Sequence, residues 1–123
     1  MIAHTSVTVS NYEKAKEFYQ ILLGTLGYTI GMDIAEYKAC GFSRDGKQDF
    51  WIAEHQTTGG IHVAFLAKSK NEVAAFHEAG LRAGGVDNGG PGYRTEYTPN
   101  YYAAFVHDAD KNNIEAVFFD PSV

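Results

Sequence analysis

The first half of the chain shows two kinds of hydrophobic periodicity in turn. Residues 3–9 alternate between apolar and polar side chains, which predicts a half-buried β-strand. Ser10–Glu13 has the spacing of a capping box, and apolar residues then recur every three or four positions up to Gly27, which predicts a helix. Three further strands are predicted, over residues 28–32, 37–44 and 49–54. The predicted order is βαβββ.

The second half repeats this order. A strand over 61–67, a capping box at Ser69–Glu72 and a helix ending at Gly84 and Gly85 precede weak strands over 86–93 and 101–107 and a strong strand over 113–119. Equivalent positions lie 58 residues apart: His4 and His62, Phe18 and Phe76, Gly27 and Gly85. We therefore predict an α+β fold, a single domain of residues 1–123 with two tandem βαβββ modules, about 1–57 and about 58–123.

A carboxylate interrupts the last predicted strand, residues 113–119. Alternation places Ile114, Ala116 and Phe118 on the packed side of this strand and Glu115 on the other. An ionised carboxylate in such a run costs several kcal/mol or more unless a cation or strong donors compensate it. The sequence offers two kinds of partner: an arginine across the sheet, with Arg44 and Arg94 as candidates, or a metal ion.

Two histidines occupy equivalent positions in the repeat, each at the opening of a module's first strand. We expect the internal pseudo-symmetry to bring His4 and His62 together, with Glu115 as a third group. Imidazole and carboxylate are ligands of borderline divalent metals such as Zn, Fe, Mn, Ni or Co, and a set of two His and one carboxylate leaves coordination positions open for substrate. The alternative for His4, which lies near the N-terminus, is an exposed histidine satisfied by water.

Composition narrows the classes of partner. The chain has 10 Lys and Arg against 15 Asp and Glu and a formal net charge of -5, without a basic cluster, so nucleic acid is not an expected partner. No leader pattern is seen, and no apolar run approaches the roughly 20 residues of a membrane span, so we expect a cytoplasmic protein without membrane association. Cys40 is the one cysteine, which excludes an internal disulfide and favours a small buried side chain.

Taken together, these features resemble the vicinal oxygen chelate superfamily, which includes glyoxalase I, extradiol dioxygenases, fosfomycin-resistance thiol transferases and bleomycin-resistance proteins. The resemblance spans essentially the whole chain and rests on the paired modules and on residues 2–19, 61–65 and 104–117. It implies a curved mixed sheet around a central pocket, with a divalent metal held by His4, His62 and Glu115. It also implies a homodimer, and in some relatives the two modules of one site come from different chains.

The chain differs from glyoxalase I at the fourth metal-ligand position. Alignment of the last hairpins of the two modules makes Trp51 the equivalent of Glu115, and the carboxylate that glyoxalase I carries falls on or beside Trp51. A three-ligand set remains, which is more similar to dioxygenases or fosfomycin-type transferases.

A glycine-, proline- and tyrosine-rich stretch, residues 87–102, precedes the last hairpin. Tyr93, Arg94 and Tyr101, with Trp51, are candidates for contacts with a small-molecule substrate, since tyrosines offer flat apolar area and an arginine can hold a carboxylate or phosphate. Glu115 and Tyr102 are the catalytic candidates, with Tyr102 as the donor of a hydrogen bond or proton. The alternative is a long connection packed by its own aromatics, or a dimer surface.

Two functions are consistent with these patterns. The first is an enzyme, a lyase or dioxygenase, in which a divalent metal chelates and activates a small oxygenated substrate. The second is a metal-free binding protein of the bleomycin-resistance type, in which Trp51 and the tyrosines hold a planar ligand.

Overall fold

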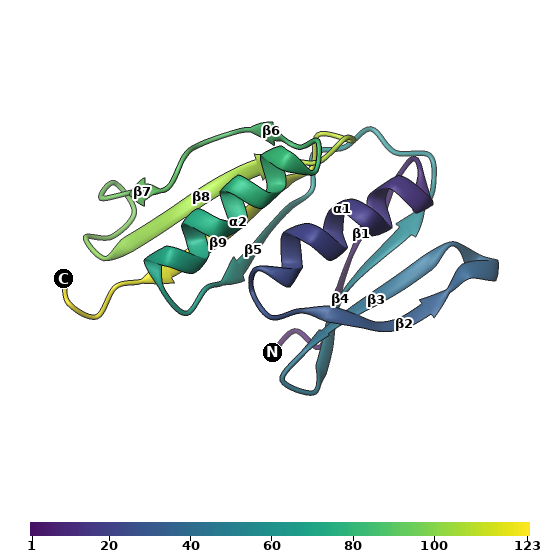
Figure 1. Ribbon diagram of the computed structural model, residues 1–123, viewed down its shortest axis with the longest axis horizontal. Coiled ribbons are helices and arrows are strands. Elements are labelled where there is room, and N and C mark those ends of the chain that lie inside the picture. The colour runs from purple at the N-terminus through teal and green to yellow at the C-terminus, as the bar shows by residue number, and fades with distance from the viewer.

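Each half of the chain forms one βαβββ unit in the computed structural model, which describes residues 1–123 (Figure 1). The first unit comprises β1 (Thr5–Val9), α1 (Tyr12–Gly24), β2 (Thr29–Ile34), the short 3₁₀ helix η1 (Ala35–Tyr37), β3 (Ala39–Arg44) and β4 (Lys47–Glu54). The second comprises β5 (His62–Leu66), α2 (Lys70–Arg82), β6 (Val86–Asp87), β7 (Gly92–Tyr93), β8 (Tyr101–His107) and β9 (Asn113–Phe119). The predicted α+β order is confirmed, with the weak strand over 86–93 divided into two short ones.

Each unit has its own mixed sheet, so the expected curved sheet is built in two separately hydrogen-bonded parts. The strand orders are β1-β4-β3-β2 and β5-β9-β8-β6, with β7 also paired to β8. The first strand of each unit runs parallel to the last, and Ser6 lies opposite Trp51 as Ala64 lies opposite Glu115. Since Ala64 follows Ser6 by the repeat length of 58, the predicted equivalence of Trp51 and Glu115 is confirmed.

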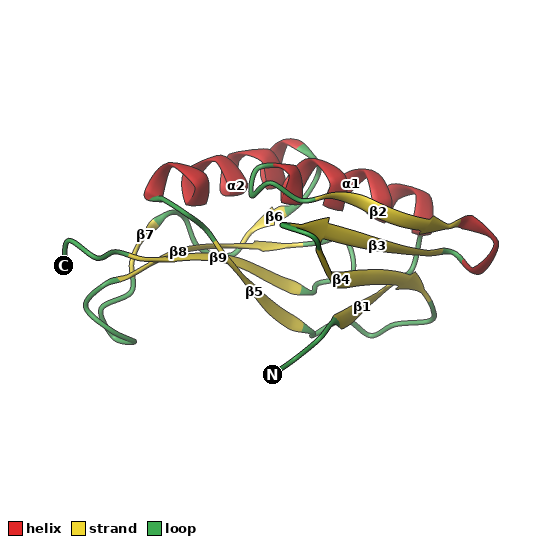
Figure 2. Ribbon diagram, turned by 90° about the horizontal axis from the view of Figure 1, so that it is seen from below, coloured by secondary structure: helices red, strands yellow, loops and turns green.

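Both helices lie side by side on one face of the two sheets (Figure 2). One cluster of buried side chains from both units fills the space beneath them, and it includes Leu22 of α1, Phe76 of α2 and Ile114 of β9. The opposite face of the sheets carries no helix. Cys40 is a buried free thiol whose pKa is raised by burial. Neither helix is long and apolar enough to cross a membrane.

The helix N-termini match the predicted capping boxes in part. Ser69 caps α2 as expected, since its hydroxyl accepts from the backbone N–H of Glu72 at 3.1 Å. The predicted Ser10 cap is wrong, because Asn11 caps α1 by accepting from the N–H of Lys14 at 3.1 Å. The Ser10 N–H instead donates to Asp110 at 3.0 Å, in the turn between β8 and β9. The cap of α1 is thus one residue later than predicted.

Asn112, in the same turn, fastens the two units together. Its side-chain oxygen accepts from the N–H of Ile61, just before β5, and its amide donates to the carbonyl of Thr8, near the end of β1, both at 3.2 Å. Asn112 is fully buried, so these bonds are shielded from water. The start of β5 is thereby held level with the end of β1.

The connection between β6 and β8 is fastened at Tyr93. Its hydroxyl donates to the nearly buried carboxylate of Asp120 at 2.5 Å, and the ammonium of Lys70 lies 3.2 Å from the same hydroxyl and 3.8 Å from Asp120. The hydroxyl of Ser122 also donates to Asp120, at 2.6 Å. Donors from Ser122 and Tyr93, with Lys70, lower the pKa of Asp120 to about 2.

We predict opposite effects for two glycine-to-alanine substitutions in the helices. A Cβ at Gly80 would lie 3.0 Å from Leu22 and from both methyl groups of Val106, whereas a Cβ at Gly24 would meet nothing within 4 Å. Gly24→Ala should stabilise by about 0.5–1 kcal/mol through helix propensity. Gly80→Ala should instead destabilise by about 1 kcal/mol, because overcrowding outweighs the same gain. Urea unfolding of both variants checks the contrast, and equal stabilisation would contradict it.

Asp120 should make stability depend on acid pH in a defined window. Because its folded-state pKa is about 2 and the unfolded value is about 4, its contribution is present above pH 4 and is lost as pH falls towards 2. The stability difference between wild type and Asp120→Asn, measured by urea unfolding, should be constant from pH 7 to about 5 and shrink from 4 to 2. All other acidic residues are common to both proteins, so a stability difference that does not change with pH would refute this role of Asp120.

Candidate functional site

A hollow of about 410 Å³ lies on the helix-free face of the second sheet. It is lined by side chains of β5, β8, β9 and the segment before β8, namely His62, Tyr97, Tyr101, Phe105, Asn113 and Glu115. Strand alternation explains the set, because Glu115 points away from the helices while its neighbours Ile114 and Ala116 are fully buried beneath α2. The face predicted for Glu115 is thus the face that carries the pocket.

The Glu115 carboxylate is covered and fully engaged. Its side chain is 3% exposed, one oxygen lies 3.1 Å from Nε2 of His62, and the hydroxyl of Tyr101 donates to the other. The arginines considered as partners do not pair with it; Arg44 donates to the carbonyls of Leu26 and Leu66 instead. Burial first, and then the bond to Glu115, raise the pKa of Tyr101, so this phenol stays protonated and keeps donating.

His62 is oriented by its second ring nitrogen. Nδ1 lies 3.1 Å from the carbonyl oxygen of Asn113 and donates to it in the tautomer that carries the hydrogen on Nδ1, since a carbonyl only accepts. Nε2 faces the carboxylate of Glu115. When Nε2 carries a hydrogen it donates to that carboxylate, and when the hydrogen is on Nδ1 the Nε2 lone pair and the carboxylate can hold a metal ion between them.

The two donors have the separation that one metal ion requires. Ligand atoms about 2.0–2.2 Å from one ion, at angles of about 90–109°, lie about 2.8–3.6 Å apart, and the Nε2–Oε1 distance is 3.1 Å. The backbone bond from Nδ1 is also what metal-ligating histidines usually make. His62 and Glu115 fit as two ligands of one ion. They do not complete a site, because no three His, Cys, Asp or Glu side chains of the chain come together for a metal.

The expectation that His4 joins His62 is wrong within one chain. Asn112 holds the start of β5 against Thr8, at the end of β1, whereas His4 precedes the start of β1. Four residues of strand separate His4 from Thr8, which is about 13 Å. The pseudo-symmetry sets β1 and β5 in opposite directions, so equivalent residues lie at opposite ends, and His4 is exposed there.

Trp51 lies on the helix-free face of the other sheet. It is half-buried, and its indole covers Gly41, where a Cβ would come within 2.8 Å of the ring. Its cross-strand neighbours on the same face are Ser6 and Gly41. Trp51 therefore does not line the pocket of its own chain.

Two of the predicted tyrosines face the helix side. Tyr102 packs partly buried against the core and contacts Tyr93, with ring centroids 5.0 Å apart, so neither reaches Glu115. The donor beside Glu115 is Tyr101, one residue away on the other face of β8. The strand register identifies Tyr101 as the tyrosine that faces Glu115. Phe105 pairs with Glu115, and the residues two and four positions before Phe105 lie on the same face of β8. Sequence reasoning also missed Phe105, Asn113 and Tyr97.

Arg94 lies beside this pocket without lining it. Its guanidinium carbon is 5.4 Å from the centroid of the Phe105 ring, and Phe105 in turn stacks at 6.4 Å on His62. The predicted substrate contacts are thus divided: Tyr101 and Arg94 lie at or near the pocket, while Tyr93 and Trp51 lie elsewhere.

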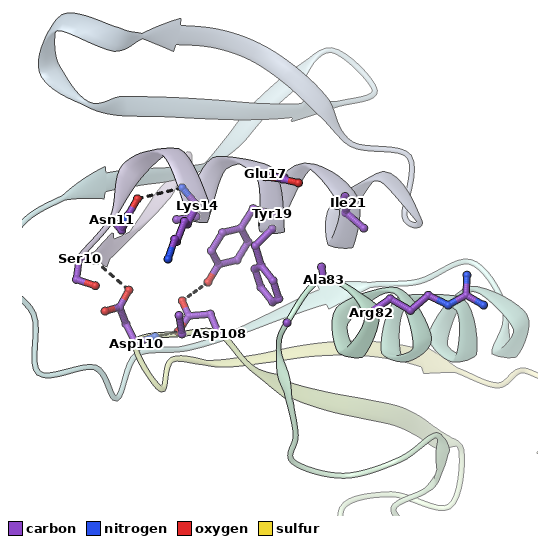
Figure 3. A pocket seen from close by; sticks show the side chains of 14 residues that line it. Ser10, Asn11, Lys14, Glu17, Tyr19, Ile21, Arg82, Ala83, Asp108 and Asp110 are labelled. Carbon is purple, nitrogen blue, oxygen red and sulfur yellow. Dashed lines mark hydrogen bonds between the residues drawn. The ribbon is translucent and has the colours of Figure 1, made fainter.

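A larger hollow of about 610 Å³ lies between α1, the end of α2 and the β8–β9 turn (Figure 3). Its polar groups bond to each other: buried Tyr19 donates to Asp108 at 2.6 Å, and the exposed Ser10 N–H donates to Asp110 at 3.0 Å. None of the predicted site residues lines it. The smaller hollow is the candidate site, because there an imidazole and a carboxylate face each other across a gap that a cation fits.

Comparison with solved structures places this fold in a known group. The chain is 32% identical to a glyoxalase/bleomycin resistance protein from Albidiferax ferrireducens T118, with a TM-score of 0.82 over 94% of this chain and 97% of the other. No protein-family model matches the sequence. No curated protein matches it either.

Two more distant structures share the fold alone. The fosfomycin resistance protein FosX from Listeria monocytogenes is 18% identical, with a TM-score of 0.73 over 99% of this chain and 95% of the other. A lactoylglutathione lyase from Agrobacterium tumefaciens is 14% identical, with a TM-score of 0.69 over 96% and 92%. The identity and coverage of the A. ferrireducens relative show that the chain belongs to the glyoxalase/bleomycin resistance protein family, within the vicinal oxygen chelate superfamily.

Proposed function

We propose that this protein binds a divalent metal at a site shared by two copies of the chain and uses it to bind and activate a small molecule with adjacent oxygen atoms. His62 and Glu115 of one copy and His4 of the other are the proposed ligands. The observation that carries the proposal is the 3.1 Å approach of Nε2 of His62 to the buried carboxylate of Glu115. A carboxylate buried this deeply beside an imidazole nitrogen is a pair of groups suited to binding a divalent cation.

Support for a second copy comes from the helix-free face. Leu66 and Phe119 lie on it, 56% and 47% exposed, and Met32 lies on the same face of the other sheet, 48% exposed. Exposed apolar side chains around a polar pocket are typical of a protein interface. In a two-fold dimer whose interface lies on this face, the exposed His4 of each copy would complete the site of the other copy.

The protein's own residues have separable tasks in this proposal. Asn113 fixes the His62 ring, Tyr101 holds the second oxygen of Glu115, and Phe105 and Tyr97 form aromatic walls of the pocket. When bound, the metal supplies Lewis-acid polarisation of the substrate oxygens. The Tyr101 hydroxyl is the proposed group that donates to a substrate oxygen, in place of Tyr102.

The second candidate function is metal-free binding of a planar ligand. It is favoured by one observation: both carboxylate oxygens of Glu115 already have a partner within the chain, so the site is satisfied without metal. The aromatic walls from Tyr97, Tyr101 and Phe105 suit a flat ligand. The structural relatives include a fosfomycin resistance protein and a lactoylglutathione lyase, so the family's names do not decide between binding and catalysis.

Metal content should depend on His62 and Glu115 and not on a similar pair elsewhere. After dialysis against Zn²⁺ or Ni²⁺ and then buffer, elemental analysis should find about one ion per wild-type chain and at least about tenfold weaker retention in His62→Ala and Glu115→Gln. His77→Ala is the matched control, because His77 also contacts a carboxylate, Asp87 at 2.9 Å, outside the pocket. Wild-type protein without stoichiometric metal, or unchanged content in His62→Ala, would leave metal-free binding as the function.

Mixing variants should distinguish a shared site from a site within one chain. His4→Ala and Glu115→Gln proteins, each depleted of metal, are unfolded together and refolded. Half of randomly formed dimers are mixed, and each mixed dimer has one intact site only if His4 acts across the interface, so metal binding should recover to about a quarter of wild type. Two His4→Ala and His4→Asn samples mixed in the same way are the control and should recover none. If wild type binds metal and the complementary pair recovers none, a shared site is excluded.

A further inference from the structure

We propose that Arg94 is an anchor for an oxyanion, so that the ligand of this pocket is a small acid carrying a carboxylate, phosphate or phosphonate group. The inference deepens the proposed function and rests on it for the end of the ligand that reaches His62 and Glu115. The starting observation is an unpaired charge. Of the three arginines, Arg44 and Arg82 have carboxylates at 4.0 and 2.8 Å, whereas Arg94 has none, in a chain with more acidic than basic residues.

The guanidinium group of Arg94 is held in place by the chain itself. It donates to the carbonyl oxygens of Gly92 at 2.8 Å and Gly90 at 2.7 Å and lies over the ring of Phe105. A guanidinium has five N–H bonds, so three remain after these two. A fixed fork with free donors is suited to bidentate binding of an oxyanion and loses little entropy when it binds one.

The glycines of the loop make room for this arrangement. A Cβ at Gly89 would lie 3.1 Å from Nη2 of Arg94, and a Cβ at Gly92 would lie 3.3 Å from Nη1. Gly89 also has a backbone φ of +141°, which residues other than glycine rarely adopt. The glycine-rich sequence thus has a local purpose, which is to let the backbone wrap closely around one guanidinium.

The strand order places Arg94 and His62 on the two sides of the carboxylate. Going across the sheet, His62 is on β5, Glu115 on β9 and Phe105 on β8, and Arg94 is on the segment beyond β8. The guanidinium carbon of Arg94 lies 5.4 Å from the centroid of the Phe105 ring, and that ring lies 6.4 Å from the His62 ring, so the two outer groups are within about 12 Å of each other. A ligand with one ring or a short carbon chain spans this distance.

The experiment compares ligands that differ only in their acid group. Zn²⁺-loaded wild-type protein is titrated by calorimetry with catechol, which offers two adjacent oxygens, and with 3,4-dihydroxybenzoate, 3,4-dihydroxyphenylacetate and 3,4-dihydroxyphenylphosphonate. At least one acid should bind roughly 10- to 100-fold more tightly than catechol. The acid group that gives the tighter binding, carboxylate or phosphonate, identifies the preferred oxyanion. Arg94→Gln should remove that preference while catechol affinity stays within about twofold, and Arg82→Gln, on the exposed end of α2, should keep it.

The outcomes separate this inference from the proposed function. If Zn²⁺ binds but no acid is preferred, or if Arg94→Gln weakens catechol and the acids equally, the oxyanion role of Arg94 is overturned and the metal proposal stands. If Zn²⁺ does not bind, the metal proposal fails, and the metal-free protein is titrated with benzoate and phenylphosphonate. Binding that Arg94→Gln abolishes then supports the oxyanion role, and no binding overturns it.

Discussion

The organisation of the site depends on the cost of burying one carboxylate. Glu115 is in the middle of a strand whose adjacent residues are fully buried, and its own side chain is 3% exposed. Both oxygens must therefore be compensated within the protein, and His62 and Tyr101 do so from the two strands that flank β9. The bond from His62 to the Asn113 carbonyl and the stacking of Phe105 on His62 follow from holding that imidazole in place. Without the carboxylate, His62 and Tyr101 would lose the contact that fixes their orientation.

The arrangement of the two modules decides what a single chain can assemble. The helices pack side by side and share one core, which leaves the helix-free faces of both sheets uncovered. The same packing sets β1 and β5 in opposite directions, as the bonds of Asn112 to both strands require. Equivalent residues at the strand starts, such as His4 and His62, are then far apart in one chain, whereas Leu22 and Gly80 near the centre of the helix pair lie in contact. The proposed ligand set contains both histidines, so it would need a second copy of the chain for its completion.

Local and repeat signals in the sequence were sufficient for most of the fold. Runs of β-forming residues predicted the bounds of β8 and β9, and alignment of the last hairpins of the two modules made Trp51 the equivalent of Glu115, which the strand registers confirm. These features depend on residues close in sequence or on duplication. The prediction that His4 meets His62 is wrong within one chain, because it depended on the orientation of the pseudo-symmetry axis, which the repeat offset does not specify. The choice of Tyr102 over Tyr101 failed for a different reason: which of two adjacent residues faces Glu115 depends on hairpin register, and one residue of slip exchanges the faces.

The equivalence of Trp51 and Glu115 shows how the duplicated modules have diverged in chemistry. At one position the second module holds a buried charge that needs two donors, and the first holds an indole resting on Gly41, where any side chain would displace it. An indole needs no cation, so the first module lacks the constraint that organises His62, Tyr101 and Asn113 in the second. The second module carries the charged groups, and the first carries an apolar side chain at the equivalent position and an exposed histidine before β1. In the two-fold dimer proposed above, each site would receive groups of both kinds, and Trp51 at the position of Glu115 would limit it to the three proposed ligands.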